Sequence, residues 1–190
     1  MSVVTTTYDA GREIGLRQAA EGSTSSVVTS LTGADDAGGP KGRILMVGSS
    51  GGHLAQLVSM REAFRGSHLR WVTFPTADAL SILAGEDVVH AHHPTTRNIP
   101  NLLRNAWLAV RLLLQDRPAA IISTGAGVAV PFFVLGWLLR IPTVYIEVFD
   151  RLDTRTLTGR LCRPFTTRML VQWEEQLPLY RNAQLVGALL

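Results

Sequence analysis

Three consecutive residues, Gly51, Gly52 and His53, combine a permissive backbone with a side chain that can move a proton. Glycine lets a ligand approach the main chain closely. An imidazole can act as a base, an acid or a hydrogen-bond donor to phosphate near neutral pH. Apolar residues at helical spacing follow, so this segment should begin a helix, where free N–H groups attract anions. Together with Ser50, these residues are candidates for binding a phosphate or activating a hydroxyl group.

The turn from Gly48 to His53 matches neither of two common nucleotide-binding fingerprints. It is not G-x-G-x-x-G, and it lacks the lysine and threonine required by G-x-x-x-x-G-K-[ST]. A glycine-rich corner also occurs in α/β domains without any ligand, and a loop histidine can be structural. The functional and the structural interpretation therefore both stay open at this point.

A second glycine turn, formed by Gly125, Ala126 and Gly127, follows another apolar segment. Open parallel sheets bind ligands in the crevice at the carboxyl ends of their strands, so both turns should face the same crevice and bind the same ligand. Glu147 ends a further apolar segment and should reach that edge. Its carboxylate is expected to orient a sugar hydroxyl or the histidine, or else to pair with Arg151 at the rim.

Three histidines, His90, His92 and His93, lie close together in the sequence. Neighbouring imidazoles can share a zinc ion, but no acidic or cysteine ligand stands at a recognisable spacing. We therefore expect no metal site. Arg97 follows in a polar loop, where its guanidinium is available to contact an acceptor or its phosphate.

Helical and strand patterns alternate along the chain and predict a doubly wound parallel α/β sheet. The expected strands are Ile44–Val47, Leu69–Phe74, Val88–His90, Ala119–Ser123, Thr143–Ile146 and Arg168–Val171. The expected helices follow His53, cover Ala77–Ala84, Ile99–Gln115 and Val128–Leu139, follow Gly159, and follow Trp173, where Glu174 and Glu175 would cap the start. Residues 1–40 are rich in Ser, Thr, Gly and Ala and are expected to form a disordered arm, which leaves 41–190 as one domain.

The longest expected helix has a broad apolar face opposite a polar one. The apolar residues are Leu102, Leu103, Ala106, Trp107, Val110, Leu113 and Leu114, and the polar ones Asn101, Arg104, Asn105, Arg111 and Gln115. One interpretation is that the apolar face covers the sheet. The other is that Trp107 and Leu108 lie in a membrane interface, with Arg104 and Arg111 at the lipid headgroups.

Composition narrows the class of protein. The 190 residues include 18 basic and 15 acidic ones, and this mild excess, with no lysine-rich stripe, argues against nucleic acid as a partner. Cys162 is the only cysteine, which excludes an internal disulfide and suits a reducing compartment. The longest apolar run, Ala126–Leu139, is shorter than the ~20 residues that span a bilayer, and the first residues lack a secretory pattern. We expect a cytoplasmic protein, peripheral on the inner face of the plasma membrane.

Four motifs in order, GSSGGHL, STGAGVAVPFF, YIEVFDR with LTGRL, and VQWEEQ, resemble the Alg14 family and its bacterial PssD-type relatives of capsule and exopolysaccharide synthesis. The resemblance covers about residues 43–187. It implies the N-terminal half of a split glycosyltransferase of the GT-B fold, a Rossmann-like domain similar to half of the lipid-linked N-acetylglucosamine transferase of peptidoglycan synthesis.

The resemblance also implies partners and roles. This half would bind a polyprenyl-diphosphate-linked acceptor and the membrane, while an Alg13- or PssE-type chain would bind the nucleotide sugar, expected to be a UDP-sugar, so no cofactor is expected in this chain. Gly51, Gly52 and His53 match the acceptor-side loop, and Glu147 matches the acid after the fifth strand. His53 and Glu147 are thus the expected catalytic residues. The alternatives are a non-catalytic membrane adaptor that recruits the catalytic chain and a free-standing nucleotide-binding protein.

Overall fold

The computed structural model describes residues 42–95 and 97–189, and within them it contains one parallel sheet of seven strands in the order β3-β2-β1-β4-β5-β6-β7. The strands are β1 (Arg43–Val47), β2 (His68–Thr73), β3 (Asp87–His90), β4 (Ala120–Ser123), β5 (Thr143–Ile146), β6 (Arg168–Val171) and β7 (Gln184–Leu185). The predicted doubly wound parallel sheet is therefore confirmed. The strand β7 was not predicted, and the expected arm of residues 1–40 lies outside the described residues.

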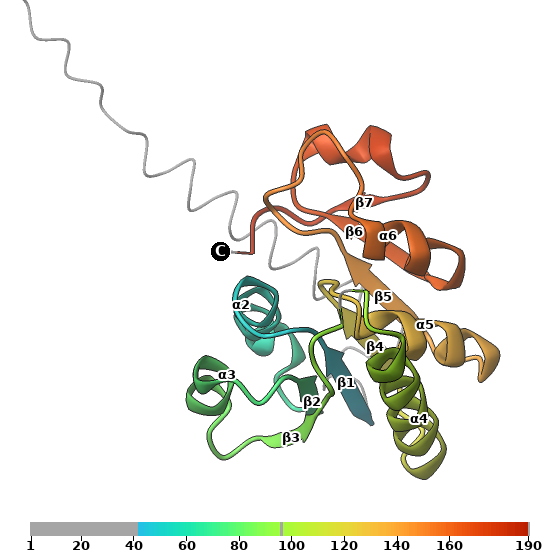
Figure 1. The fold of residues 1–190 in the computed structure, drawn as a ribbon. Coiled ribbons are helices and arrows are strands. Elements are labelled where there is room, and N and C mark those ends of the chain that lie inside the picture. Colours follow the sequence, from blue (N-terminus) through green and yellow to red (C-terminus); the bar gives the residue numbers. More distant parts are fainter. Residues whose placement is uncertain (1–41, 96, 190) are drawn as a thin grey trace, which may run out of the picture.

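Helices cover both faces of the sheet (Figure 1). They are α2 (Gly52–Ser59), α3 (Ala77–Ile82), α4 (Ile99–Gln115), α5 (Ala129–Leu138) and α6 (Leu157–Cys162), and the 3-10 helices are η1 (Arg61–Phe64), η2 (Arg163–Phe165) and η3 (Glu174–Leu179). One core cluster packs α2 and α3 on the sheet, and the other packs α4, α5 and α6 on the opposite face. Because both faces are covered, the central strands read as continuous apolar runs.

The direction of winding reverses between β1 and β4. From β1 the chain adds β2 and β3 on one side, and it then returns to place β4 against β1 on the other. The pairing aligns Val47 at the end of β1 with Ser123 at the end of β4. Ligands of open parallel sheets bind at such a switch point, outside the carboxyl ends of the strands. The two glycine turns follow these two strand ends.

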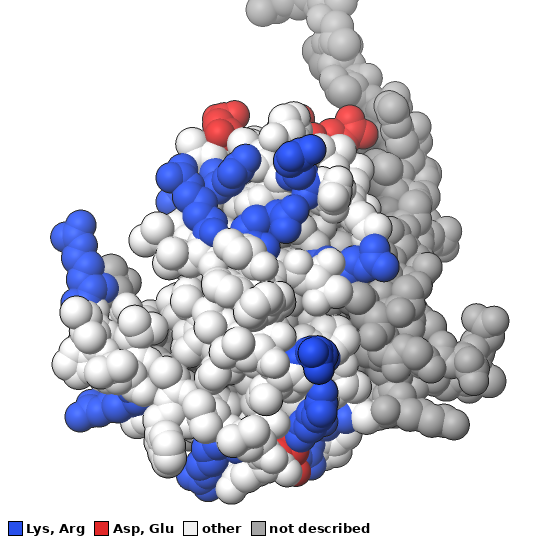
Figure 2. Space-filling model, turned by 90° about the vertical axis from the view of Figure 1, so that its right-hand side faces the viewer, with Lys and Arg blue, Asp and Glu red and all other residues white. Residues whose placement is uncertain are grey.

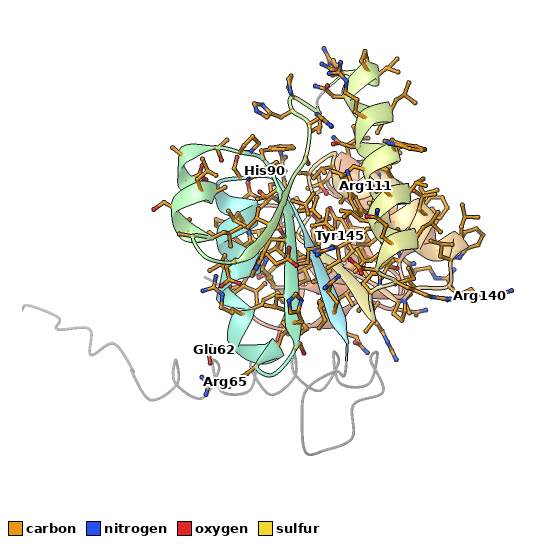
Figure 3. The ribbon with its side chains drawn as sticks, turned by 90° about the horizontal axis from the view of Figure 1, so that it is seen from below. Glu62, Arg65, His90, Arg111, Arg140 and Tyr145 are labelled. Atoms are coloured by element: carbon orange, nitrogen blue, oxygen red, sulfur yellow. The ribbon has the colours of Figure 1, made fainter. Side chains whose placement is uncertain are left out.

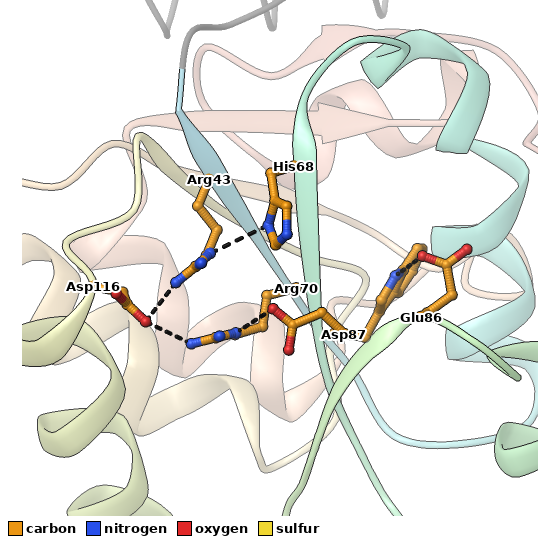
Figure 4. A network of polar contacts seen from close by, with 7 residues as sticks. Arg43, His68, Arg70, Glu86, Asp87 and Asp116 are labelled. Atoms are coloured by element: carbon orange, nitrogen blue, oxygen red, sulfur yellow. Dashed lines mark hydrogen bonds and ion pairs between the residues drawn. The ribbon is translucent and has the colours of Figure 1, made fainter.

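Charged side chains gather at the opposite, amino end of the strands (Figure 4). Arg70 donates from Nε to Asp87 over 2.8 Å and from a terminal nitrogen to Asp116 over 2.7 Å. Asp116 also pairs with Arg43, so one carboxylate joins β1, β2 and the end of α4. The hydrogen bond to Asp87 raises the pKa of Arg70 further above its ordinary value. This cluster ties the sheet together on the edge away from the glycine turns.

Buried glutamines fasten the loop that follows β5. Gln176 donates from Nε2 to the carbonyl oxygens of Val148 and Arg151 over 2.8 and 3.0 Å. Its Oε1 accepts from the backbone N–H groups of Gln172 and Trp173 over 2.8 and 3.2 Å. Buried polar groups need such partners, so one fully buried amide side chain satisfies four main-chain groups.

Trp173 is the N-cap residue of η3, and Glu174 and Glu175 lie in its first turn, as expected. Their side chains are exposed, and the side chain that bonds the N–H group of Trp173 is that of Gln176. The helix itself is of the 3-10 type and contains Pro178. In the motif VQWEEQ, the two buried glutamines are therefore the residues with a structural role.

We expect Gln176→Leu to lower the free energy of unfolding by about 2–4 kcal/mol, because leucine fills a similar volume and leaves four main-chain groups, two of them buried, without this partner. Urea denaturation measures this change. Glu175→Gln, an exposed neighbour on the same turn, serves as the control and should stay within about 0.5 kcal/mol of the unmodified protein. Equal stability of the two variants would contradict the assigned role of Gln176.

Candidate functional site

The side chain of His53 is fixed by the main chain of the second glycine turn. Its Nδ1 lies 2.8 Å from the carbonyl oxygen of Thr124. A carbonyl oxygen only accepts, so Nδ1 carries the proton, and Nε2 of the neutral ring is an unprotonated acceptor. In return, the Thr124 hydroxyl donates to the carbonyl oxygen of His53 over 2.8 Å. This half-buried imidazole is thereby held in the tautomer that a general base requires.

Three loops meet at the second glycine turn. A side-chain carbon at Gly125 would lie 3.2 Å from Cε1 of His53, so the imidazole packs directly on this glycine. A carbon at Gly127 would lie 3.0 Å from Cβ of Thr95, in the loop between β3 and α4. Gly125 and Ala126 take positive φ angles of 113° and 67°, which turn the backbone between these contacts. We call these residues, His53, Thr95 and Gly125–Gly127, the loop junction.

A carboxylate accepts a hydrogen bond from one N–H group of the first glycine turn. The N–H group of Gly51 donates to Oδ2 of Asp78, at the start of α3, over 2.8 Å. Hydrogen bonds from Thr76 and then from Gly51 lower the pKa of Asp78 below its ordinary value. The N–H group of Gly51 is thus already used, and a negative charge stands beside the turn where a phosphate is expected. Gly52 and Ser50 remain exposed or half-exposed at the helix start.

Glu147 is fully buried, so neither expected role at the rim of the sheet fits. Its carboxylate accepts from the Thr156 hydroxyl over 2.9 Å and from the Tyr180 hydroxyl. Burial, and then the hydrogen bond to Glu147, raise the pKa of Tyr180, which keeps this donor protonated. Between Glu147 and the loop junction stands Tyr145, whose hydroxyl would lie 2.8 Å from a side-chain carbon at Gly125. Glu147 therefore lies behind Tyr145 as seen from the loop junction and has a structural role there.

The histidine-rich segment leads into Thr95 of the loop junction. His92, His93 and Arg97 are exposed, and so is His90 at the end of β3. Within the described ranges, no three His, Cys, Asp or Glu side chains stand close enough to hold a metal ion. The ring of His93 packs 5.4 Å from that of Phe74, at the carboxyl edge of the sheet.

The helix α4 is turned the other way from the expectation that its apolar face covers the sheet. Its buried residues are Asn101, Asn105, Ala109, Leu112 and Leu113. Its exposed large apolar residues are Ile99, Leu102, Leu103, Trp107 and Leu114. Of the expected membrane residues, Trp107 is 72% exposed, whereas Leu108 packs against the core cluster. The outer face of α4 is therefore apolar and uncovered.

An apolar groove of ≈ 390 Å³ runs between α4 and α5, lined by Leu103 and Trp107 on one side and Val134 and Leu135 on the other. Figure 2 views this side of the molecule, where uncharged residues fill the middle, arginines surround them and acidic residues appear only at the margins. In Figure 3, Arg140 extends away from the body of the protein while Tyr145 lies in its interior. No helix in the described part of the chain is long and apolar enough to cross a bilayer.

A parallel sheet that reverses at β1 and β4, with two glycine turns meeting there, defines a Rossmann-like domain of the kind found in each half of GT-B proteins. Acinetobacter baumannii MurG shares this fold with a TM-score of 0.62 and 16% identity, over 75% of this chain and 45% of the MurG chain. Residues 87–189 match the family described as "Oligosaccharide biosynthesis protein Alg14 like", and the chain belongs to this family.

Curated relatives agree with this assignment. The mouse protein named "UDP-N-acetylglucosamine transferase subunit ALG14" is 24% identical over 177 residues, which are 76% of this chain and 82% of the mouse protein. A Roseiflexus protein, named as an N-acetylglucosamine transferase acting on pyrophosphoryl-undecaprenol, is 39% identical over 105 residues. The aligned part is 54% of this chain but only 20% of that protein.

Sequence reasoning missed the residues that hold the site together. Thr124 bonds both the ring and the backbone of His53, and Asp78 bonds Gly51. Thr95 packs on the second turn, and Tyr180 bonds Glu147 from 33 residues away. Of these residues, only Thr124 could have been identified from the sequence, because it stands directly between a strand and the glycine turn. The other contacts depend on tertiary structure.

We expect Cys162, buried beside Glu147, to resist thiol reagents in the folded protein. Burial, and then the charge of Glu147, raise the pKa of this thiol to about 12. An aromatic disulfide reagent at pH 8 should label it only after denaturation, and because it is the only cysteine the signal is unambiguous. Because the folded pKa is the higher one, this thiol's contribution to stability is complete below pH 9.0 and is lost as the pH rises toward 12. Rapid labelling of the native protein would contradict this.

Proposed function

We propose that this chain is the acceptor-binding, membrane-associating subunit of a two-chain glycosyltransferase. The enzyme moves a sugar from a nucleotide donor to an acceptor linked to polyprenyl diphosphate, in the synthesis of an exopolysaccharide, a capsule or a lipid-linked oligosaccharide. The complex works on the cytoplasmic face of the membrane. The donor is bound mainly by a second, Alg13- or PssE-type chain.

The observation that carries this proposal is the uncovered apolar face of α4 and α5 beside the loop junction. A lipid-linked acceptor does not leave the bilayer, so its enzyme must bring the reacting groups to the lipid surface. Trp107 and Leu103 are exposed by 72% and 65%, and no partner in the described structure covers them. Arg104 and Arg111 flank them on the same helix, as in helices that lie in a lipid interface.

Chemistry at the junction centres on His53. The ring donates from Nδ1 to Thr124, so Nε2 can accept the proton of the attacking acceptor hydroxyl. The hydroxyl oxygen then forms a bond to the anomeric carbon of the donor sugar, and the bond from that carbon to the nucleotide diphosphate breaks. The partner chain stabilises the departing diphosphate.

The names of the relatives support the donor and the partner. Several are called subunits of a UDP-N-acetylglucosamine transferase, which favours a UDP-sugar donor and a second subunit. The fold supports the same arrangement, because this chain corresponds to 45% of the MurG chain. The position of the glycine turns at the switch point of the sheet supports a role for them in binding the acceptor.

We expect His53→Ala, assayed in the complex with its partner and a lipid-linked acceptor, to lower kcat by about 10²–10⁴, the contribution of a general base. His68→Ala removes an imidazole at the amino edge of the sheet, away from the junction, and should retain normal turnover.

Full turnover of His53→Ala would remove the catalytic role and favour the alternative, a membrane adaptor that recruits a catalytic partner. In that case the exposed face of α4 would still be required for activity at membranes. Tight binding of a nucleotide by this chain alone would instead favour a free-standing nucleotide-binding protein.

We expect Trp107→Glu to weaken binding to lipid vesicles by about 10- to 100-fold, because inserting one large apolar side chain contributes about 1.5–3 kcal/mol. Co-sedimentation with vesicles measures this change. The matched control is Leu80→Glu, which adds the same charge at a 54% exposed leucine of α3, on the other side of the sheet. Equal binding by both variants would show that α4 is not the membrane face.

A further inference from the structure

The loop that enters α4 is held rigidly by two buried asparagines. Asn105 accepts from the N–H group of His92 over 2.8 Å and donates to the carbonyl oxygen of the same residue over 2.9 Å. Asn101 donates to the carbonyl oxygen of Pro94 over 3.0 Å. These asparagines occupy the inner face of α4, where an apolar residue would otherwise be expected. The helix therefore fixes the backbone of the loop before it.

The same loop joins the loop junction to the apolar face. Thr95 packs on Gly127 at the junction. Ile99, four residues later, is 69% exposed and begins the uncovered face of α4. A molecule with its tail on this apolar face and its reacting end at the junction can pass along this short segment.

The side chains available along that path are cationic or hydrogen-bond donors. His92, His93 and Arg97 are exposed there. The sequence from residue 88 to residue 115 contains three histidines and three arginines but no Asp or Glu. An anionic group at this place meets no opposing carboxylate from the loop or from α4.

The first glycine turn is less suited to the same anion. The Asp78 carboxylate already accepts from Gly51, so a phosphate there would face a negative charge at close range. The N–H group of Asn101 in the first turn of α4 is likewise taken, by the Asn98 side chain over 3.0 Å. The exposed side chains of the loop, His92, His93 and Arg97, are therefore better placed to donate to a phosphate than these two N–H groups.

We propose that His92, His93 and Arg97 form a subsite for the diphosphate of the lipid-linked acceptor, between the membrane face and the loop junction. This inference rests on the proposed function and assigns its phosphate recognition to residues outside the glycine turns. Arginine suits this task because its planar guanidinium forms two parallel bonds to phosphate oxygens. Asn101 and Asn105 are positioning residues that hold the loop in place.

The test uses the full chain and phosphatidylcholine vesicles that contain undecaprenyl diphosphate, undecaprenyl monophosphate, phosphatidylglycerol or no addition. We expect the diphosphate to strengthen binding about tenfold or more over the other three. A triple variant, His92→Ala, His93→Ala and Arg97→Asn, should lose this gain and keep its binding to the other vesicles. Asparagine is chosen because Arg97 has a positive φ of 50°, which asparagine tolerates.

Arg65→Gln, which removes one charge from an exposed arginine that follows η1 on the other face of the sheet, is the control and should retain the gain from the diphosphate. Circular dichroism and urea denaturation establish that both variants fold. A gain that survives in the triple variant overturns the subsite. So does an equal gain from phosphatidylglycerol, which would indicate attraction to any anionic headgroup.

Absence of any gain in the unmodified protein also overturns the subsite, and transfer activity of the complex then decides the proposed function separately. An active complex without this gain would retain the proposed function and place the diphosphate elsewhere. Free pyrophosphate added to the diphosphate vesicles should reduce binding of the unmodified protein and leave that of the triple variant unchanged.

Discussion

The reciprocal hydrogen bonds between His53 and Thr124 join the two halves of the sheet where its winding reverses. They are possible because β1 and β4 are neighbours and end at the same level, with Val47 opposite Ser123. They also determine the tautomer of His53, because the carbonyl acceptor decides which ring nitrogen carries the proton. Gly125 completes the arrangement, because a side chain at this position would press on the Tyr145 hydroxyl and on the imidazole.

The two faces of helix α4 differ in their residues and in their contacts. The inner face combines Ala109, Leu112 and Leu113, which pack on the core, with two asparagines that bond the preceding loop. The outer face carries large apolar side chains that have no covering element among the described residues. A helix that only covered the sheet would have the opposite distribution. This distribution fits the proposed membrane role of the outer face.

The sequence was sufficient for the sheet, because continuous apolar runs separated by helical patterns are typical of buried parallel strands. It also placed both glycine turns at one edge, since this follows from parallel topology alone. It left the orientation of α4 open, because periodicity reveals that a helix has an apolar side but not which side faces the protein. A leucine packed in the core and a leucine on an exposed apolar face cannot be distinguished from the sequence. The short strand β7 has too few residues to produce a pattern.

The polar interior was the least predictable part. Glu147 stands directly after a strand, as a catalytic acid would, yet Tyr180 and Thr156 enclose it. The loop glutamine Gln176 bonds main-chain groups up to 28 residues away. Such pairs depend on distances that only the folded chain sets. Asp78 is a further example, since nothing in its sequence neighbourhood connects it with Gly51.

The thickness of α4 has a consequence for the choice of glycan. A helix with its side chains is about 10–12 Å across. If the outer face of α4 lies in the lipid interface, as proposed, the loop after β3 lies about one helix diameter away from the lipid, because Asn101 and Asn105 bond it to the inner face of α4. The helix would then act as a spacer of fixed thickness between the lipid and the loop junction, which would favour acceptors that carry a short saccharide.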